Sequence, residues 1–440
     1  MKIFKSSRLL TIILVLIFIF SLSMSGCQKE EKKIVIWATS AILGMDEAEL
    51  PKEEWLFTKL LDEYTKKTGI KFELNLMTNE TELQLSIKAN ALAGTGPDIV
   101  NLWTGPYVAN LESILLPLND YMSDYDKQQI IGLDVMTNDL KEPNENNKIL
   151  GYPFGGNEVC LMLYNKEIIR NCGLDFEKNP PSTVDEFEQS MKIIKENSYL
   201  PIIASDWEAN SLINYVFNKW WIQMDGIDNV RAICEGKKKF VDSEAFKETF
   251  KKLNQYYELG YINSDYLTFQ TADIAFYNGE GAMYPTGNWD VGLAMQELGE
   301  DLGILEVPDY SPNSVIPNYI TGGNGQSMCI LANTKYPKEC ADFLAWLSNK
   351  ENSIRLGKHK SVLPLRRDIS LEEYGYGEND IEKQIYEMSK NLHIWHEYYM
   401  DPEVADFYMK FGTSAIIGEL SVDDFAKKMD EKVMEIEGKQ

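Results

Sequence analysis

The chain has 440 residues, a formal net charge of −25 and 44% hydrophobic residues, with nine Trp and 23 Tyr. This composition excludes a disordered protein, and the length exceeds one ordinary core, so we expect two domains. The negative charge disfavours nucleic acid, anionic lipid surfaces and polyanionic ligands, and it does not affect neutral ligands.

The first 27 residues predict export. A basic start precedes an apolar run over 9–20, which is shorter than the roughly 20 residues that a membrane-spanning helix needs. Small residues follow and end in Gly26-Cys27, as in a bacterial lipoprotein signal. We therefore expect residues 1–26 to be a signal peptide, Cys27 to be the lipidation site, and 27–32 to be a charged tether at the outside of the cell membrane. The alternative is an uncleaved N-terminal anchor.

Five cysteines follow Cys27, an odd number without a C-x-x-C pair, so the sequence predicts neither a zinc site nor a disulfide framework: Cys160, Cys172, Cys234, Cys329 and Cys340. Cys160 and Cys329 lie in apolar runs and are expected in the core. One disulfide among the five stays open, because an exported protein meets an oxidising compartment.

The first third of the chain alternates strand and helix patterns. Residues 33–38 form an apolar run typical of a buried parallel strand. Helical spacing begins near Pro51 and ends at Gly69, and alternation over 70–76 predicts the next strand. A helix over 81–93 and a strand over 98–103 follow. This order favours a parallel sheet with helices on both faces.

The rest of the chain continues the mixed pattern. Thr183 and Glu186 are spaced for a capping box at a helix start. The remaining predictions are strands at 161–164, 200–204, 303–307 and 327–331, helices at 208–222, 243–258 and 339–348, and a mostly helical, aromatic-rich last hundred residues.

Few residues suggest bond chemistry. His393 and His396 are three apart beside Glu397, but a zinc site needs three or four ligands and no further one is suitably spaced. We therefore predict no metal, and a surface aromatic helix there. No nucleophile-elbow, phosphate-loop or kinase signature is present. A glycosidase-type pair of carboxylates stays open, since nothing marks any two carboxylates as partners.

Aromatic residues at turns are the main sign of a ligand. Trp103, Trp207 and Trp289 lie beside Gly, Asn or Asp. Sugar C–H faces stack on aromatic rings, and sugar hydroxyls pair with amides and carboxylates. A core role is the alternative, and we expect it for Trp37, inside a strand, and Trp346, on an apolar helix face.

The order of several short segments resembles family 1 of the extracellular solute-binding proteins, the carbohydrate-binding components of ABC importers related to maltose-binding protein. The most specific segment is 275–289, AFYNGEGAMYPTGNW. The others are 33–38 (KIVIWA), 96–100 (GPDIV), 115–121 (LLPLNDY), 150–153 leading to 163–166 (LYNK), 180–187 (PPSTVDEF), 322–332 with 338–347, and 363–366 (LPLR).

The resemblance implies an α/β, two-lobe fold of the periplasmic-binding-protein type II, in which each lobe is a sheet flanked by helices and the ligand lies between the lobes. Lobe 1 would contain 33–155 with 319–360, and lobe 2 would contain 156–318 with 361–440. It also implies a monomer without cofactor or enzymatic activity. Such a protein captures a sugar or oligosaccharide and delivers it to the permease subunits of an ABC transporter.

Site residues follow from the resemblance. Trp289 matches the family's stacking Trp after Gly287, and Glu158, six residues before Tyr164, matches a hinge-side carboxylate that accepts sugar hydroxyls. Ser40, Trp103 and Thr104 follow strands, at the edge where open α/β sheets bind ligands. The remaining candidates are Asn157, Trp207, Asp290, Gly323, Asn324, Arg366 and Trp395.

The expected ligand loops favour a neutral solute. The segments 39–45, 101–107, 154–158, 205–210 and 286–290 contain no Lys or Arg, whereas a phosphorylated ligand would require several. The same fold with a non-sugar solute is one alternative, and a secreted carbohydrate-active enzyme with two opposed carboxylates is another. The sequence does not identify the sugar, its length or its linkage.

Overall fold

The computed structural model describes residues 32–438, except 45–46, 48–49, 79, 141–143, 145, 207–211, 312–313, 376 and 378. Trp207 and Cys27, together with the predicted signal peptide, lie outside the described residues. Within the described part, no helix combines the length and the apolar character needed to cross a membrane.

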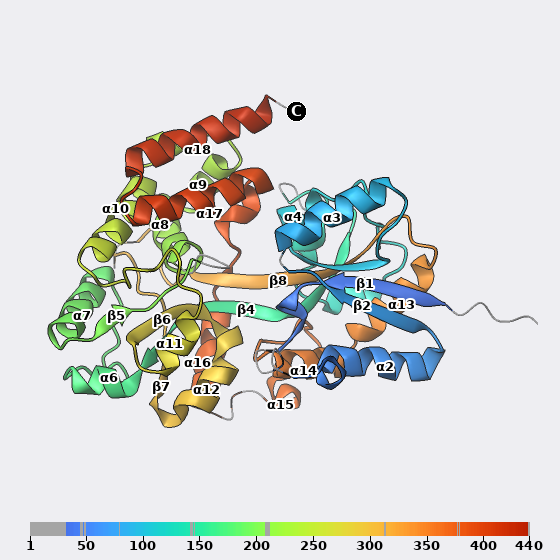
Figure 1. Ribbon diagram of the computed structural model, residues 1–440, viewed down its shortest axis with the longest axis horizontal. Coiled ribbons are helices and arrows are strands. Elements are labelled where there is room, and N and C mark those ends of the chain that lie inside the picture. The colour runs from blue at the N-terminus through green and yellow to red at the C-terminus, as the bar shows by residue number, and fades with distance from the viewer. Residues whose placement is uncertain are drawn as a thin grey trace, which may run out of the picture.

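The first lobe, on the right of Figure 1, begins with three parallel strands. β1 (Lys33–Ala38) lies between β2 (Lys71–Leu76) and β3 (Ile99–Trp103), and Ile34 and Ile36 of β1 are fully buried. The helix predicted to end at Gly69 is α2 (Leu56–Thr68), and Gly69 ends it with φ +80°. The other helices of this lobe are α3 (Glu80–Leu92), α4 (Pro106–Ala109), α5 (Asp124–Gln129), α13 (Pro337–Leu347), α14 (Lys350–His359) and α15 (Leu371–Tyr374).

Two long antiparallel strands join the lobes (Figure 1): β4 (Gly151–Asn165) and β8 (Ile320–Ile330). The order along the sheet is β2-β1-β3-β8-β4-β6-β5, where β6 is Gly281–Gly287 and β5 is Leu200–Ile202. In addition, β7 (Leu302–Leu305) pairs with β4, and β9 (Leu392–His393) pairs with β8. The sheet is therefore mixed, and the parallel arrangement expected from the first third holds only there. β4 is much longer than the predicted strand at 161–164, because Gly and Pro in its first half resemble a loop.

The backbone of β4 is irregular at the crossing. Its register against β8 shifts between Phe154 and Asn157, where Gly155 has φ +82°. A third chain segment, the one that contains Leu363, pairs with β4 at this point. Asn157 and Leu363 exchange backbone hydrogen bonds of 2.8 and 3.2 Å. A Cβ on Gly156 would lie 2.4 Å from the Leu363 carbonyl oxygen, so only glycine admits this passage.

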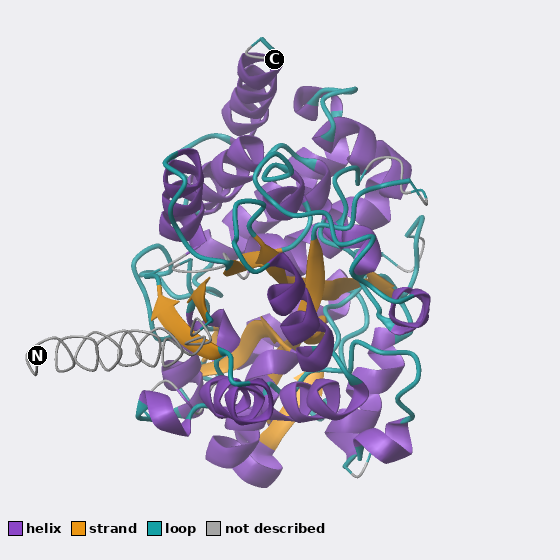
Figure 2. Ribbon diagram, turned by 90° about the vertical axis from the view of Figure 1, so that its right-hand side faces the viewer, coloured by secondary structure: helices purple, strands orange, loops and turns teal. Residues whose placement is uncertain are grey.

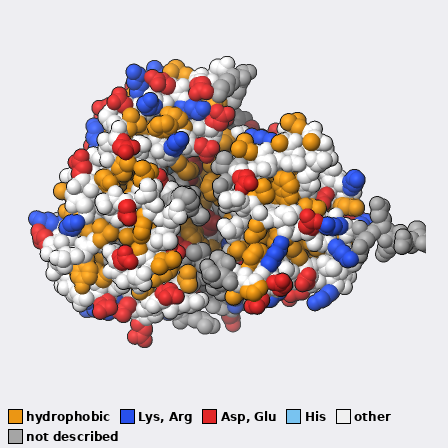
Figure 3. Space-filling model, in the orientation of Figure 1, with side chains coloured by type: hydrophobic (Ala, Val, Ile, Leu, Met, Phe, Trp, Pro, Cys, Tyr) orange, Lys and Arg blue, Asp and Glu red, His pale blue; other side chains and the backbone are white. Residues whose placement is uncertain are grey.

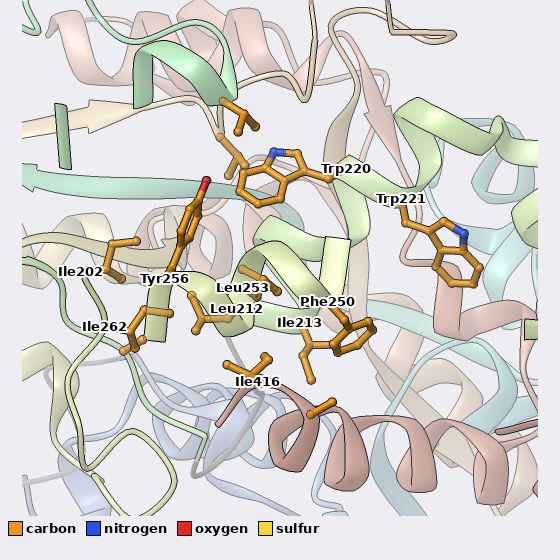
Figure 4. Close-up of a cluster of buried hydrophobic side chains, with 14 of the residues drawn as sticks. Ile202, Leu212, Ile213, Trp220, Trp221, Phe250, Leu253, Tyr256, Ile262 and Ile416 are labelled. Carbon is orange, nitrogen blue, oxygen red and sulfur yellow. The ribbon is translucent and has the colours of Figure 1, made fainter. Parts of the chain in front are cut away.

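The second lobe, on the left of Figure 1, contains β5 (Leu200–Ile202), β6 (Gly281–Gly287) and β7 (Leu302–Leu305). Its aromatic core is shown in Figure 4, where Trp220 and Tyr256 pack edge to face at 6.2 Å. Its helices are α6 (Lys166–Asn171), α7 (Val184–Glu196), α8 (Asn218–Asp225), α9 (Ile227–Cys234), α10 (Glu244–Glu258), α11 (Ala272–Tyr277), α12 (Val291–Leu298), α16 (Asp380–Ser389), α17 (Pro402–Ile416) and α18 (Val422–Glu437), and the short strand β9 is Leu392–His393.

Helix starts agree with the predictions in part. The α10 range matches the predicted helix, and Thr183 caps α7 by accepting the Glu186 backbone N–H at 3.4 Å. The Glu186 carboxylate bonds Ser182 instead of Thr183, so the expected capping box is only half formed. Residues 212–217, inside the predicted helix 208–222, are π-helical.

The exact division into lobes stays a prediction. One core cluster contains buried residues between 34 and 154 and between 328 and 356. Another contains buried residues between 162 and 319, including Tyr319, and between 400 and 436. Arg366, expected in lobe 2, bonds Asp126 and the Ser348 carbonyl of the first lobe, so the segment after 360 continues to pack there.

All five cysteines after Cys27 are buried, and no disulfide joins them: Cys160, Cys172, Cys234, Cys329 and Cys340. The expected core positions of Cys160 and Cys329 are confirmed. The predicted surface helix around His396 is wrong, because His396 is fully buried in a short 3-10 turn (His396–Tyr399). The rings of Trp221 and Tyr408 cover its imidazole.

Candidate functional site

A furrow is visible between the two lobes in Figure 3. One hydrophobic cluster, here called the interlobe cluster, contains residues of both lobes. Tyr215, Trp395 and Tyr398 of this interlobe cluster pack with Leu102 and Val108 of the first lobe. Trp289 is partly exposed at its margin. In the view of Figure 2 strands cross between the upper and lower helices, and the sheet therefore forms the middle layer.

The Gly-x-Trp motif has a physical explanation. The ring of Trp289 lies against Gly287, where an added Cβ would be 2.1 Å from ring atom Cζ3. Asn288, between them, fixes the turn to β4, since its Oδ1 accepts the Val159 N–H at 2.9 Å and its Nδ2 donates to the Asn157 carbonyl at 3.3 Å. Trp289 meets Tyr215 edge to face at 5.5 Å. The turn thus holds a partly exposed ring rigidly beside the crossing strands.

Glu158 lies on β4 just after the irregular stretch. Its carboxylate occupies the space left by Gly325, where a Cβ would be 2.3 Å from Oε2. Burial raises the pKa of Glu158 to about 7, and the nearby Lys360 charge partly opposes this rise. Within the described residues no hydrogen-bond donor reaches this carboxylate, so its acceptor positions are available to a ligand.

Tyr398 was not predicted, yet it completes the contact between the lobes. Its ring covers Gly105, where an added Cβ would be 2.5 Å from the ring, and its hydroxyl lies 2.5 Å from Thr104 Oγ1. Thr104 donates its own proton to the Asn324 carbonyl at 2.7 Å, so Tyr398 is the donor. Trp395 lies beside Tyr398 with ring centroids 5.6 Å apart, and over Gly323. The sequence signal for Tyr398 was its place in the aromatic-rich C-terminal stretch, three positions after the candidate Trp395.

Lys360, which follows α14, was also missed. Its ammonium donates to the Ala41 carbonyl and lies 5.8 Å from the Phe154 ring centroid. Burial lowers the pKa of Lys360, while the charges of Glu158 and Glu47 oppose that effect. The loops expected to bind the ligand contain no Lys or Arg. The fold nevertheless places the Lys360 ammonium beside the Ser40 turn, although the two are far apart in the sequence.

The predicted site residues therefore separate into two groups. Ser40 is exposed, and Trp103, Asn157, Glu158, Trp289 and Gly323 are partly exposed. Trp103 meets Tyr107 edge to face at 5.3 Å. These residues have side-chain or backbone surface exposed to solvent.

The remaining described candidates are buried and hold structure together. Asp290 accepts a hydrogen bond from Thr286, and Asn324 donates to the carbonyls of Phe154 and Gly156 at 3.3 Å. Arg366 bonds Asp126 at 3.0 Å and Asp368 at 2.8 Å. Thr104 and Trp395 are buried as well and connect the lobes through Tyr398. Their role toward a ligand stays a prediction.

A metal site is not formed by the described residues, since no group of three or more His, Cys, Asp or Glu is close enough to hold an ion. The described residues form only pairs of this kind: His359 Nε2 lies 2.8 Å from Glu47 Oε2, and His396 Nδ1 lies 3.6 Å from Glu397 Oε2.

Comparisons with known proteins agree with this architecture. A family model described as "Bacterial extracellular solute-binding protein" matches residues 59–379. Among solved structures, a chitin oligosaccharide binding protein is 19% identical, with coverage of 86% of this chain and 94% of that chain and a TM-score of 0.74. An ABC substrate-binding protein from Listeria monocytogenes in complex with cycloalternan is 14% identical, with coverage of 93% and 100% and a TM-score of 0.71.

A third structure, an ABC transporter solute-binding protein from Thermotoga lettingae bound with α-D-tagatose, is 17% identical, with coverage of 92% and 99% and a TM-score of 0.70. No curated protein matches the sequence. The expected two-lobe α/β fold is confirmed.

Proposed function

We propose that this protein, which belongs to the family of bacterial extracellular solute-binding proteins, captures a neutral sugar or oligosaccharide between its lobes for an ABC permease. The observation that carries the proposal is the Glu158 carboxylate, which accepts no hydrogen bond from the described residues and is close enough to Tyr215 and Tyr398 for its charge to act on both. Tyr215 pairs with the partly exposed Trp289, and Tyr398 pairs with Trp395. An aromatic ring accepts the C–H face of a sugar, and a carboxylate accepts its hydroxyls.

The named ligands of similar structures support a sugar. Chitin oligosaccharide, cycloalternan and tagatose are carbohydrates of very different size. They therefore support a carbohydrate as the ligand of this protein and do not indicate how many sugar units it has.

Closure and anchoring belong to the same proposal. Ligand contacts with both lobes would favour a closed arrangement by rotation about the crossing strands. We further propose that the protein is a monomer held at the membrane by acyl chains on Cys27, and that it leaves its ligand chemically unchanged.

The experiment is a thermal-shift screen of the mature chain against neutral mono- and oligosaccharides, uronic acids, sugar phosphates and short peptides. A ligand at 100 times its dissociation constant adds about 2.7 kcal/mol of stability. At least one neutral sugar should raise the unfolding midpoint and be recovered intact after prolonged incubation. Stabilisation by charged solutes or peptides alone would contradict the proposal, and turnover of a glycoside would favour an enzyme.

A further inference from the structure

Lys360 is held at the meeting point of the Ser40 turn and the crossing strands. A Cβ on Gly155 would lie 3.3 Å from Lys360 Cε, so the side chain passes closely over this glycine. One of the three ammonium N–H groups is used by the Ala41 carbonyl. Within the part of the chain that the structure describes, no second acceptor receives a hydrogen bond from this ammonium. Lys360 is thus fixed in place with donors to spare.

Glu158 presents the complementary group. The Glu158 carboxylate has free acceptor positions, and it and the Lys360 ammonium act on each other's ionisation. No ion pair within 4.0 Å joins these two described residues. They are close enough to sense each other's charge and too far apart to bond directly.

Glycines keep the surroundings of both groups open. Gly325 has no side chain in the space that the Glu158 carboxylate occupies, and Gly155 has none where the Lys360 side chain passes. Half-buried charges without direct partners are costly, and a ligand that bonds both offsets that cost. Opposite charges also leave the pair neutral, which suits an uncharged solute.

We propose that Glu158 and Lys360 together determine which sugar binds, with one ligand hydroxyl donating to the Glu158 carboxylate and an adjacent hydroxyl accepting from the Lys360 ammonium. This inference rests on the proposed function and adds to it the ligand feature that is recognised, a pair of neighbouring hydroxyl groups. Lys360 thus determines specificity although it lies outside the five loops that the sequence predicted to bind the ligand.

The test measures affinity by calorimetry, with the sugar found in the screen and its single-deoxy analogues. Lys360→Met keeps the length and apolar character of the side chain and removes the charge. Hydrogen bonds to charged groups correspond to roughly 10- to 150-fold in dissociation constant, so this variant should weaken the parent sugar by that factor. The deoxy analogue that lacks the accepting hydroxyl should bind wild type and Lys360→Met equally.

Two further variants separate recognition from folding. Lys358→Met is the control: Lys358 lies two residues earlier, on α14, with an exposed side chain over Tyr374 at 5.9 Å, and its loss should change neither affinity nor unfolding midpoint. Lys360→Gln keeps a donor at Nε2 and should recover part of the affinity that Lys360→Met loses.

The outcomes distinguish the two claims. Sugar binding by Lys360→Met with wild-type affinity for the parent would overturn this inference and leave the proposed function standing. Equal losses for the parent and all its deoxy analogues would also overturn it. If only anionic solutes bind wild type, the neutral-sugar function and the hydroxyl-pair recognition both fail.

Discussion

The Tyr398 hydroxyl and the Thr104 hydroxyl lie 2.5 Å apart, although 294 positions separate them in the chain. Thr104 follows β3 in the first lobe, and Tyr398 follows β9, which pairs with the second-lobe end of β8. Because Thr104 also donates to Asn324 of β8, this contact joins both lobes to a crossing strand.

Tyr398→Phe removes that hydrogen bond and keeps the ring on Gly105. We expect a loss of about 0.5–1.5 kcal/mol in the free energy of unfolding, measured with urea. Tyr152→Phe is the matched control, because the buried Tyr152 hydroxyl has no hydrogen-bond partner among the described residues. Equal effects of the two substitutions would show that the contact between the lobes adds no stability.

Trp289→Ala should affect binding more than folding. Losing the stacked ring area should cost about 1.5–3 kcal/mol of binding, or roughly tenfold to more than a hundredfold in dissociation constant. Trp346→Ala is the control, since Trp346 packs against Tyr64 at 5.0 Å in the first-lobe core. It should lower the unfolding midpoint and keep sugar affinity. The reverse pattern would remove Trp289 from the site.

Glu397 should make the protein less stable above neutral pH. Burial raises the pKa of Glu397 to about 8 and lowers the pKa of His396 to about 3. Between pH 4.5 and 6.5, the ordinary pKa values of the two groups, their effects on the pH dependence oppose each other. From pH 6.5 to 8 the folded protein keeps a proton on Glu397 that the unfolded chain has released. Stability therefore falls with rising pH there, by at most about 1.4 kcal/mol per unit.

Glu397→Gln should abolish most of this fall, and the exposed Glu280→Gln should leave it unchanged. Urea unfolding at pH 6.5 and 8.5 measures both. A wild-type stability that is level across this range, or a Glu397→Gln variant with the same decline, would contradict the assignment.

Cys27→Ser should abolish lipidation. Stable membrane attachment takes two acyl chains, whereas one chain gives marginal binding. The Ser variant should incorporate no radiolabelled fatty acid and should leave the membrane fraction, while Cys172→Ser should behave as wild type. Labelling that persists in Cys27→Ser would exclude this anchor.

Regular periodicity made part of the fold predictable. β1 has its predicted bounds, and α2 ends at the predicted Gly69, because continuous apolar runs and helix stops are local signals. The first half of β4 was missed because its glycines are needed where three chain segments cross closely. Such a requirement depends on distant parts of the chain and leaves no local sequence pattern. His396 was misplaced because a short polar motif does not reveal the rings that bury it.

The site was predictable to a similar extent. Glu158 came from the family resemblance, Trp289 came from its place on a Gly-Asn turn and from the resemblance, and both are partly exposed. Tyr398 and Lys360 were missed because their importance arises from contacts with Thr104 and Ala41, far away in sequence. Arg366 matched a family segment, but its guanidinium is occupied by Asp126 and Asp368.

Hydrogen–deuterium exchange with and without saturating sugar tests the central claim, capture of a sugar between the lobes, most directly. The account predicts slower amide exchange on both sides of the furrow, at 103–107 and 157–160 and again at 287–290 and 395–398, with α10 unchanged as a remote reference. Protection confined to one lobe, or absent from all four segments despite measured binding, would contradict it.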